Sequence, residues 1–189
     1  MPSASSGPPG QPVFQLRIHL ADVDPLIWRR VLVPGSVRLA KLHEMFQAAM
    51  GWTGSHLHAF HIGDQRFGMR FDDWDEDEVD EKEVTVLQAL RDQQGFIYEY
   101  DFGDSWSHEV VIEDFRRLPI GLKHAVCLVG ENACPPEDCG GVGGYAVLCE
   151  AIGDPAHEEH DELSRWLGEP FDPVAFDLAL VNAALQRVR

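Results

Sequence analysis

The feature that most constrains the fold is a run of alternating residue types between Phe96 and Ile112. Residues at even positions are mainly aromatic or β-branched, and those at odd positions are mainly polar. This period of two indicates β structure with one buried face, because successive side chains of a strand point to opposite sides. The sequence Phe102-Gly103-Asp104-Ser105 interrupts the run with residue types typical of turns and bulges. We therefore predict two antiparallel strands joined at Gly103.

The register of the two strands is predicted from the need to keep their faces consistent. A two-residue turn would set the apolar face of one strand against the polar face of the other. A three-residue connection or bulge avoids this mismatch, and we favour it. It places Tyr100 opposite His108, and it places Phe102 opposite Trp106. Asp104 and His108 then point toward the apolar side, either as a capping carboxylate and a core histidine or as side chains that line a cleft.

Further strands are expected before this run. Apolar and polar residues alternate over residues 14–20, and an apolar-rich run covers residues 27–33 after a turn at residues 22–25. Two such runs joined by a turn predict an antiparallel hairpin. A short strand is expected at residues 56–62, and a polar linker at residues 113–123.

The spacing of apolar residues changes to three and four elsewhere, which predicts helices. Ser36 is expected to cap the first of them, and Asp172-Pro173 to begin the last, because aspartate caps a helix and proline fits its first turn. The expected helices cover residues 36–51, 85–90, 145–152, 158–167 and 172–188. Strands followed by helices predict an α+β fold: a mostly antiparallel sheet with an N-terminal hairpin, helices packed on it and helices at the C-terminus.

The length and composition suit one domain. With 189 residues and 44% hydrophobic content, the chain can bury a substantial core. We expect residues 1–12 to be a disordered leader and residues 13–189 to form a single domain. The leader lacks the basic start and apolar centre of a secretion signal, and no stretch approaches the roughly 18 apolar residues of a membrane span. We therefore predict a cytoplasmic protein with reduced thiols.

The formal net charge of −17 limits the classes of partner. A surface this negative repels phosphate backbones and anionic lipid head groups, which argues against nonspecific nucleic-acid binding and against a membrane. Divalent cations, basic proteins and small molecules stay open as partners. Arg29 and Arg30 are expected to pair with acidic surface groups.

Two segments suggest metal ligands but lack a complete local set. His56, His58 and His61 lie within six residues, but only His56 and His58 share a face of the expected strand. These two lack a third ligand near in sequence, and a partly buried aromatic ladder would use the same pattern. Residues 72–83 are strongly acidic, but Glu78 stands where a calcium loop requires glycine and Val84 where it requires glutamate. We predict a solvated loop there.

The segment Cys134 to Tyr145 (CPPEDCGGVGGY) needs something to fix its shape, because its prolines and glycines form few regular hydrogen bonds. Cys134 and Cys139 have a spacing seen at structural zinc sites, with Cys127 as a third ligand. His124 or Cys149 would complete a zinc site. The alternative is a set of reduced, partly buried thiols.

A metal-dependent hydrolase is the competing function. It would use carboxylates and a histidine to hold a hard cation and activate water, and the glycines before Tyr145 to receive an anionic group. Cysteine nucleophiles paired with His108 are a weaker version of the same idea. The residues involved are Asp101, Asp104, His108, Glu137 and Asp138, with Tyr100, Asp101, Trp106 and Tyr145 as candidates to line a ligand cleft. Each version requires the Gly103 region and the CPPEDCGG segment to be neighbours in space.

The motifs that carry a family resemblance are PLIWRRVLVP at residues 25–34, LHEMFQAAMGW at 42–52, HLHAF at 56–60, YEYDFGDSWSH at 98–108, CPPEDCGGVGGY at 134–145 and FDPVAFDLALVN at 171–182. In this set and order the chain resembles the plasmid pRiA4b ORF-3-like proteins, which are also described as passengers of an IS1096-type mobile element. The resemblance implies a single α+β domain and an association with plasmids or mobile elements. It implies no particular activity.

Overall fold

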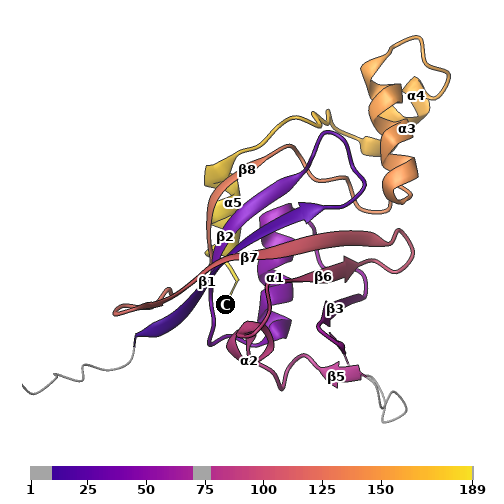
Figure 1. Ribbon diagram of the computed structural model, residues 1–189. Helices are drawn as coiled ribbons and strands as arrows, with labels where there is room; N and C mark the ends of the chain where they lie inside the picture. The colour runs from indigo at the N-terminus through magenta and orange to yellow at the C-terminus, as the bar shows by residue number, and fades with distance from the viewer. Residues whose placement is uncertain (1–9, 70–77, 189) are drawn as a thin grey trace, which may run out of the picture.

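An eight-stranded sheet forms the centre of the computed structural model, which describes residues 10–69 and 78–188 (Figure 1). The strands are β1 (Gln11–Leu20), β2 (Trp28–Pro34), β3 (His58–Ile62), β4 (Gln65–Gly68), β5 (Glu78–Asp80), β6 (Gly95–Tyr100), β7 (Trp106–Leu118) and β8 (Val126–Glu131). Their order across the sheet is β5-β4-β3-β6-β7-β1-β2-β8. Every pair is antiparallel except β4 with β5.

Some helices pack on the sheet, and others project beyond it. They are α1 (Leu39–Met50), α2 (Val86–Leu90), α3 (Gly141–Gly153), α4 (His160–Leu167) and α5 (Leu178–Leu185). Helix α1 packs against β2 and α5, and α5 also packs against β8. Helices α3 and α4 pack against each other and project at one end of the molecule (Figure 1). The predicted α+β class, with an N-terminal hairpin and C-terminal helices, is confirmed.

The core lies between α1 and the inner face of the central strands. Leu39, Leu42 and Phe46 form the buried stripe of α1. They share one core cluster with the inward side chains of the strands, among which Leu16 and Tyr98 are fully buried. The helically spaced apolar residues of α1 and the alternating apolar residues of the strands therefore pack together in a single layer.

The register predicted for the β6–β7 hairpin is wrong by two residues. Tyr100 pairs with Trp106 and Tyr98 pairs with His108. The connection is a five-residue loop, residues 101–105, with Asp101 at φ 57° and Ser105 at φ 55°. Two left-handed residues and the 2.6 Å hydrogen bond from Ser105 N to Asp101 O close this longer loop, and the apolar faces still match.

Three predicted helix starts are also wrong. Helix α3 begins at Gly141 and not at Tyr145, so most of the glycines that were expected to precede the helix and receive an anionic group lie inside it. Helix α1 begins at Leu39, and Ser36 does not cap it. The N–H groups of Leu39 and Ala40 instead donate to backbone carbonyls of Val84 and Glu81, so a distant segment replaces the side-chain cap. The terminal helix begins at Leu178, where the carboxylate of the capping residue accepts hydrogen bonds from two backbone N–H groups.

The segment before α5 is held in a different shape. Asp172 forms a local turn by accepting a hydrogen bond from Val174 N, and Pro173 O accepts one from Ala133 N. These bonds tie residues 172–174 to the loop after β8, so the helix that Asp172-Pro173 was expected to start begins only after Asp177.

Three other expectations concern the segment after residue 112, the acidic segment and the N-terminal leader. Residues 113–118 are not a linker, because β7 continues to Leu118 in pairing with β1. Within the acidic segment 72–83, residues 78–80 form β5, and residues 72–77 lie outside the described part of the chain. Of the expected leader, residues 1–9 lie outside it too, and β1 begins at Gln11.

Candidate functional site

The β6–β7 loop and the CPPEDCGG segment contact each other, as the sequence analysis required. Gly140 N donates a hydrogen bond of 3.1 Å to Asp104 Oδ2. Tyr100, the last residue of β6, donates its hydroxyl hydrogen to Glu137 at 3.0 and 3.1 Å from the two carboxylate oxygens. The two segments therefore form one surface, joined by hydrogen bonds at two points.

Glu137 is held by groups from two elements. Thr53, in the loop after α1, donates from its backbone N–H at 2.8 Å and from its hydroxyl at 3.0 Å to Glu137 Oε1. Tyr100 donates from the sheet, and Ser55 N in turn donates to the phenol oxygen at 3.1 Å. Burial, and then the nearby Glu137 charge, raise the pKa of Tyr100 well above its ordinary value. The phenol therefore stays protonated and stays a donor.

Trp52 fixes the start of the same segment. Its indole N–H donates a hydrogen bond of 2.8 Å to Pro135 O, and its ring stacks on Tyr100 with centroids 5.0 Å apart. Pro135 follows Cys134, so the proline pair is pinned at its first carbonyl. A hydrogen bond from the loop after α1 thus supports the CPPEDCGG segment, whose proline and glycine residues cannot supply that support themselves.

Next to Glu137, three side chains bring nitrogen and oxygen atoms together. His56 Nε2 lies 3.1 Å from Asp138 Oδ1, and His56 Nδ1 lies 3.8 Å from Asp101 Oδ1. One ligand atom from each residue falls within 4.8 Å of the other two, and within residues 10–69 and 78–188 this is the only group of three His, Cys, Asp or Glu side chains that does so. We call His56, Asp101 and Asp138 the loop cluster.

The backbone conformation orients the side chains of both aspartates of the loop cluster. Asp101 has φ 57° and Asp138 has φ 59°, in the left-handed region that few residues other than glycine, asparagine and aspartate adopt. Asp101 Oδ1 also accepts a 2.9 Å hydrogen bond from Gly103 N, which holds its side chain against its own loop. The two residues differ in exposure: the side chain of Asp101 is 10% exposed and that of Asp138 is 70% exposed.

His56 carries an unsatisfied nitrogen. Its Nε2 atom is buried and has no hydrogen-bond partner, although Asp138 Oδ1 at 3.1 Å and Glu137 Oε2 at 3.9 Å are within ion-pair distance. The contact with Asp138 therefore has the right length and the wrong angle for a hydrogen bond. A buried polar atom of this kind needs a partner.

The other side chains proposed for the cleft lie elsewhere. His108 has no exposed surface, and its Nδ1 lies 3.1 Å from both Tyr98 O and Trp106 O. Trp106 and Tyr145 are also buried. His108 therefore belongs to the core, because the corrected register places it opposite Tyr98 on the inner face of the sheet. Asp104 remains at the surface and binds Gly140 N.

All four cysteines are free thiols. Burial raises the pKa of Cys134 far above its ordinary value, and burial together with the Asp104 charge raises that of Cys139 to about 12. These thiols are therefore protonated and poor nucleophiles. In the described part of the chain, Cys127, Cys134 and Cys139 do not bring three ligand atoms within 4.8 Å of one another, with or without His124 or Cys149.

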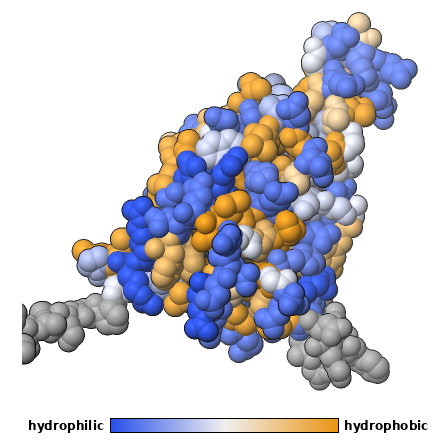
Figure 2. All heavy atoms as spheres, in the orientation of Figure 1, coloured by the Kyte–Doolittle hydropathy of each residue, from blue (hydrophilic) through white to orange (hydrophobic). Residues whose placement is uncertain are grey.

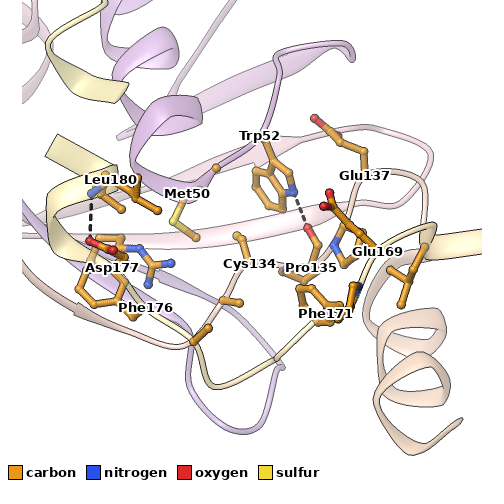
Figure 3. A pocket seen from close by; sticks show the side chains of 18 residues that line it. Met50, Trp52, Cys134, Pro135, Glu137, Glu169, Phe171, Phe176, Asp177 and Leu180 are labelled. Atoms are coloured by element: carbon orange, nitrogen blue, oxygen red, sulfur yellow. Dashed lines mark hydrogen bonds between the residues drawn. The ribbon is translucent and has the colours of Figure 1, made fainter. Parts of the chain in front are cut away.

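A cavity of about 420 Å³ lies beside the pinned segment (Figure 3). Trp52, Cys134 and Glu137 line one part of it, and Phe171 and Phe176 another. Arg29 lines it too. Contrary to the sequence expectation, the Arg29 guanidinium group does not pair with a carboxylate within the described residues, and it donates to four backbone carbonyls instead. Arg30 pairs with Glu113, as expected. Glu137 faces both the cavity and the loop cluster.

Sequence reasoning named His56, Asp101 and Asp138 as candidate ligands but assigned His56 and the two aspartates to different sites. Asp101 and Asp138 are 45 and 82 positions away in the sequence, so local spacing could not connect them. Thr53 was missed entirely. The signal that could have found the site is the joint presence of the HLHAF, DFGDSW and CPPEDC motifs, each of which contributes one member of the loop cluster or its direct neighbour.

The fold and the site together define a strongly acidic α+β protein, built on one mostly antiparallel sheet, with an imidazole–carboxylate cluster where two loops meet. The chain belongs to the family of plasmid pRiA4b ORF-3-like proteins, whose model matches residues 12–180. None of the helices in residues 10–69 and 78–188 has the length and apolar character needed to cross a membrane.

Two similar proteins match this chain over nearly its whole length. The uncharacterized protein y4hQ of Sinorhizobium fredii (strain NBRC 101917 / NGR234) is 42% identical over 177 residues, which cover 92% of this chain and 90% of that protein. The crystal structure of MM3350, a protein of unknown function from Methanosarcina mazei Go1, superposes with a TM-score of 0.81 at 32% identity. That match covers 90% of this chain and 97% of the other.

Proposed function

We propose that this protein is a binding module that holds a divalent cation in the loop cluster, and that the ion fixes the CPPEDCGG segment to the β6–β7 loop. One observation carries the proposal: His56, Asp101 and Asp138 bring three ligand atoms within 4.8 Å from three separate segments. The buried, unpartnered Nε2 of His56 supports it, because a cation would satisfy that atom.

The donor set favours a transition metal. One imidazole nitrogen with two carboxylate oxygens suits Zn²⁺ or Mn²⁺, whereas Mg²⁺ and Ca²⁺ prefer oxygen ligands alone. Two carboxylates also balance a charge of +2, which removes the repulsion between Asp101 and Asp138. Glu137 would support the site from outside, because Thr53 and Tyr100 already occupy both of its oxygens.

This proposal moves the expected metal from the cysteines to the loop cluster. Cys127, Cys134 and Cys139 with His124 or Cys149 would need to approach one another to bind zinc, whereas the loop cluster is already assembled. A variant in which Cys134 and Cys139 are both serine distinguishes the two. It keeps metal binding if the loop cluster is the site.

Metal-dependent hydrolysis is a second candidate, which one observation favours. Three protein ligands leave a coordination position open, and the side chain of Asp138 is 70% exposed, so water and a substrate would reach the ion. Glu137 is the nearest further carboxylate, and His108 takes no part because it is buried in the core. Metal-dependent cleavage of bis(p-nitrophenyl) phosphate that is lost in Glu137→Gln, while this variant still binds the metal, would favour this candidate over binding alone.

Metal binding is tested by calorimetric titration of chelator-treated protein with Zn²⁺ and Mn²⁺. We expect one ion per chain, and at least a tenfold loss of affinity in His56→Ala and in Asp101→Asn. His61→Ala is the matched control, because His61 lies on the exposed side of β3 and pairs with Glu99, outside the loop cluster. Absence of stoichiometric binding, or equal losses in His56→Ala and His61→Ala, would refute the site.

A further inference from the structure

Helices α3 and α4 enclose an apolar groove that the rest of the molecule does not cover. Leu148 and Leu163 lie at its base, and Val147 and Trp166 on its walls, around a cavity of about 350 Å³. Trp166 is 47% exposed and Val147 is 41% exposed, and α4 has no buried residue at all. An exposed tryptophan beside a groove is typical of a surface that binds a partner.

The rim of this groove is acidic. Asp138, Glu159 and Glu162 line it together with the apolar residues. Residues 134–169 contain nine acidic residues and one arginine, Arg165, a net charge of −8 with histidine neutral. Figure 2 shows that the projecting arm formed by α3 and α4 is mostly hydrophilic on the side in view.

Two of these carboxylates, those of Glu159 and Glu162, are not neutralised by the described part of the protein itself. Within the part of the chain that the structure describes, neither Glu159 nor Glu162 forms an ion pair with lysine, arginine or histidine, and the guanidinium group of Arg165 donates to the backbone oxygen of Asp161. Glu162 precedes Trp166 by four positions, so the two side chains are neighbours on one face of α4. A ligand seated on Trp166 would therefore meet negative charge beside it.

We propose that the α3–α4 groove binds a basic amphipathic segment of a partner protein. Apolar side chains of that segment would pack on Trp166 and Val147, and its lysines or arginines would pair with Glu159 and Glu162. The negative charge of the groove favours a basic partner over the other ligands. A second copy of this chain also carries a net charge of −17, so its binding would bring like charges together, and nucleic acids and anionic membranes are repelled for the same reason.

The probe is a fluorescein-labelled peptide of 14 residues with leucines at helical spacing and lysines between them. Two control peptides replace all lysines by glutamates, or all leucines by serines. We expect fluorescence anisotropy to show binding of the first peptide only, with affinity falling at least fivefold between 50 and 300 mM NaCl. Loss of binding when leucine is replaced shows that the apolar groove contributes beyond charge.

Variants assign the binding to the groove. Trp166→Ala and the double variant Glu159→Gln/Glu162→Gln are expected to weaken binding at least tenfold, and all of these side chains are exposed, so folding should persist by circular dichroism. The control Asp64→Asn/Glu83→Gln makes the same charge change on exposed residues of other loops and should alter affinity less than twofold. Asp138 is left unchanged, which keeps the loop cluster intact.

Four results would overturn the proposal. Equal losses in the two double variants would reduce the effect to general charge attraction. Unchanged affinity in Trp166→Ala, or no binding of the basic amphipathic peptide at all, would remove the groove as the site. Dimerisation of the protein that Trp166→Ala abolishes would assign the groove to a second copy.

Discussion

Tyr100 and Glu137 are joined by hydrogen bonds from one phenol to both oxygens of one carboxylate, at 3.0 and 3.1 Å, across 37 positions of sequence. The phenol belongs to the end of β6, and the carboxylate to the segment between β8 and α3. This pair positions the neighbouring Asp138 against His56, and the loop cluster therefore depends on a contact between the sheet and an otherwise irregular segment.

Tyr100→Phe tests that dependence. Removing the phenol oxygen leaves Glu137 with its Thr53 donors only, and a hydrogen bond to a charged group is worth about 1.5–3 kcal/mol. Because Glu137 is partly exposed to water, we expect the free energy of unfolding in urea to fall by about 1–2 kcal/mol, together with weaker Zn²⁺ or Mn²⁺ binding.

Tyr145→Phe is the matched control for this substitution. The Tyr145 phenol forms a hydrogen bond with the Cys149 thiol, and Tyr145 lies outside the loop cluster. Metal affinity should therefore be unchanged in Tyr145→Phe. If both variants bind metal as tightly as the wild type, Tyr100 does not position the site.

Gly141→Ala is expected to destabilise the protein by at least about 2 kcal/mol. Gly141 has φ +67°, and a Cβ atom there would lie 2.6 Å from Asp104 O, so the added methyl group would push the two loops apart. Gly143 is two positions further on and has no atom within 4 Å of such a Cβ. Gly143→Ala should therefore stabilise by about 0.5–1 kcal/mol. Thermal unfolding of the two variants measures the difference, and similar shifts in both would contradict the close approach of the loops.

His108 should make stability depend on pH. Burial lowers the pKa of His108 from 6.5 to about 4, so the unfolded chain binds a proton between these values that the folded chain does not. Stability from this group is fully present above pH 6.5 and is lost as the pH falls toward 4, by about 3 kcal/mol at 1.36 kcal/mol per pKa unit.

His108→Asn isolates that contribution. The asparagine amide can still donate to Tyr98 O or Trp106 O, while the titrating imidazole is gone. We expect lower stability at pH 7 and a flatter decline between pH 6.5 and 4 in urea titrations. A variant curve that runs parallel to the wild-type curve would exclude His108 as the titrating group.

Arg29 and Arg30 are neighbours in β2 with opposite environments. The Arg29 guanidinium donates at 2.7–3.1 Å to carbonyls that include Ala49 O at the end of α1 and Asn132 O after β8, and it is buried. Arg29→Met would leave those carbonyls unpaired, and we expect a loss of about 3 kcal/mol or more. Arg30 pairs with Glu113 at the surface, so Arg30→Met should leave the unfolding midpoint in urea almost unchanged. Equal effects would contradict this division.

The sequence predicted five of the eight strands, most helices and the fold class because those depend on local alternation and spacing, whereas β4, β5 and β8 were not predicted. The aromatic run of residues 96–112 was correctly expected to form a half-buried hairpin, and residues 85–90 to form a helix, which Thr85 caps in a capping box with Gln88. Its errors have two physical origins. The starts of α1 and α5 are decided by backbone hydrogen bonds to distant segments, which compete with the local signals at Ser36 and Asp172. The length of the β6–β7 loop is decided by the left-handed backbone of Asp101 and Ser105.

The candidate site divides in the same way. The sequence by itself determined that the surface is strongly acidic, that His56, Asp101 and Asp138 are able to hold a cation, and that the proline-glycine segment needs external support. Only the tertiary structure decided that these three residues share one place and that His108 and the cysteines do not join them. The reason is that side chains 45 and 82 positions apart meet only through sheet register and loop closure, and neither leaves a periodic trace in the sequence.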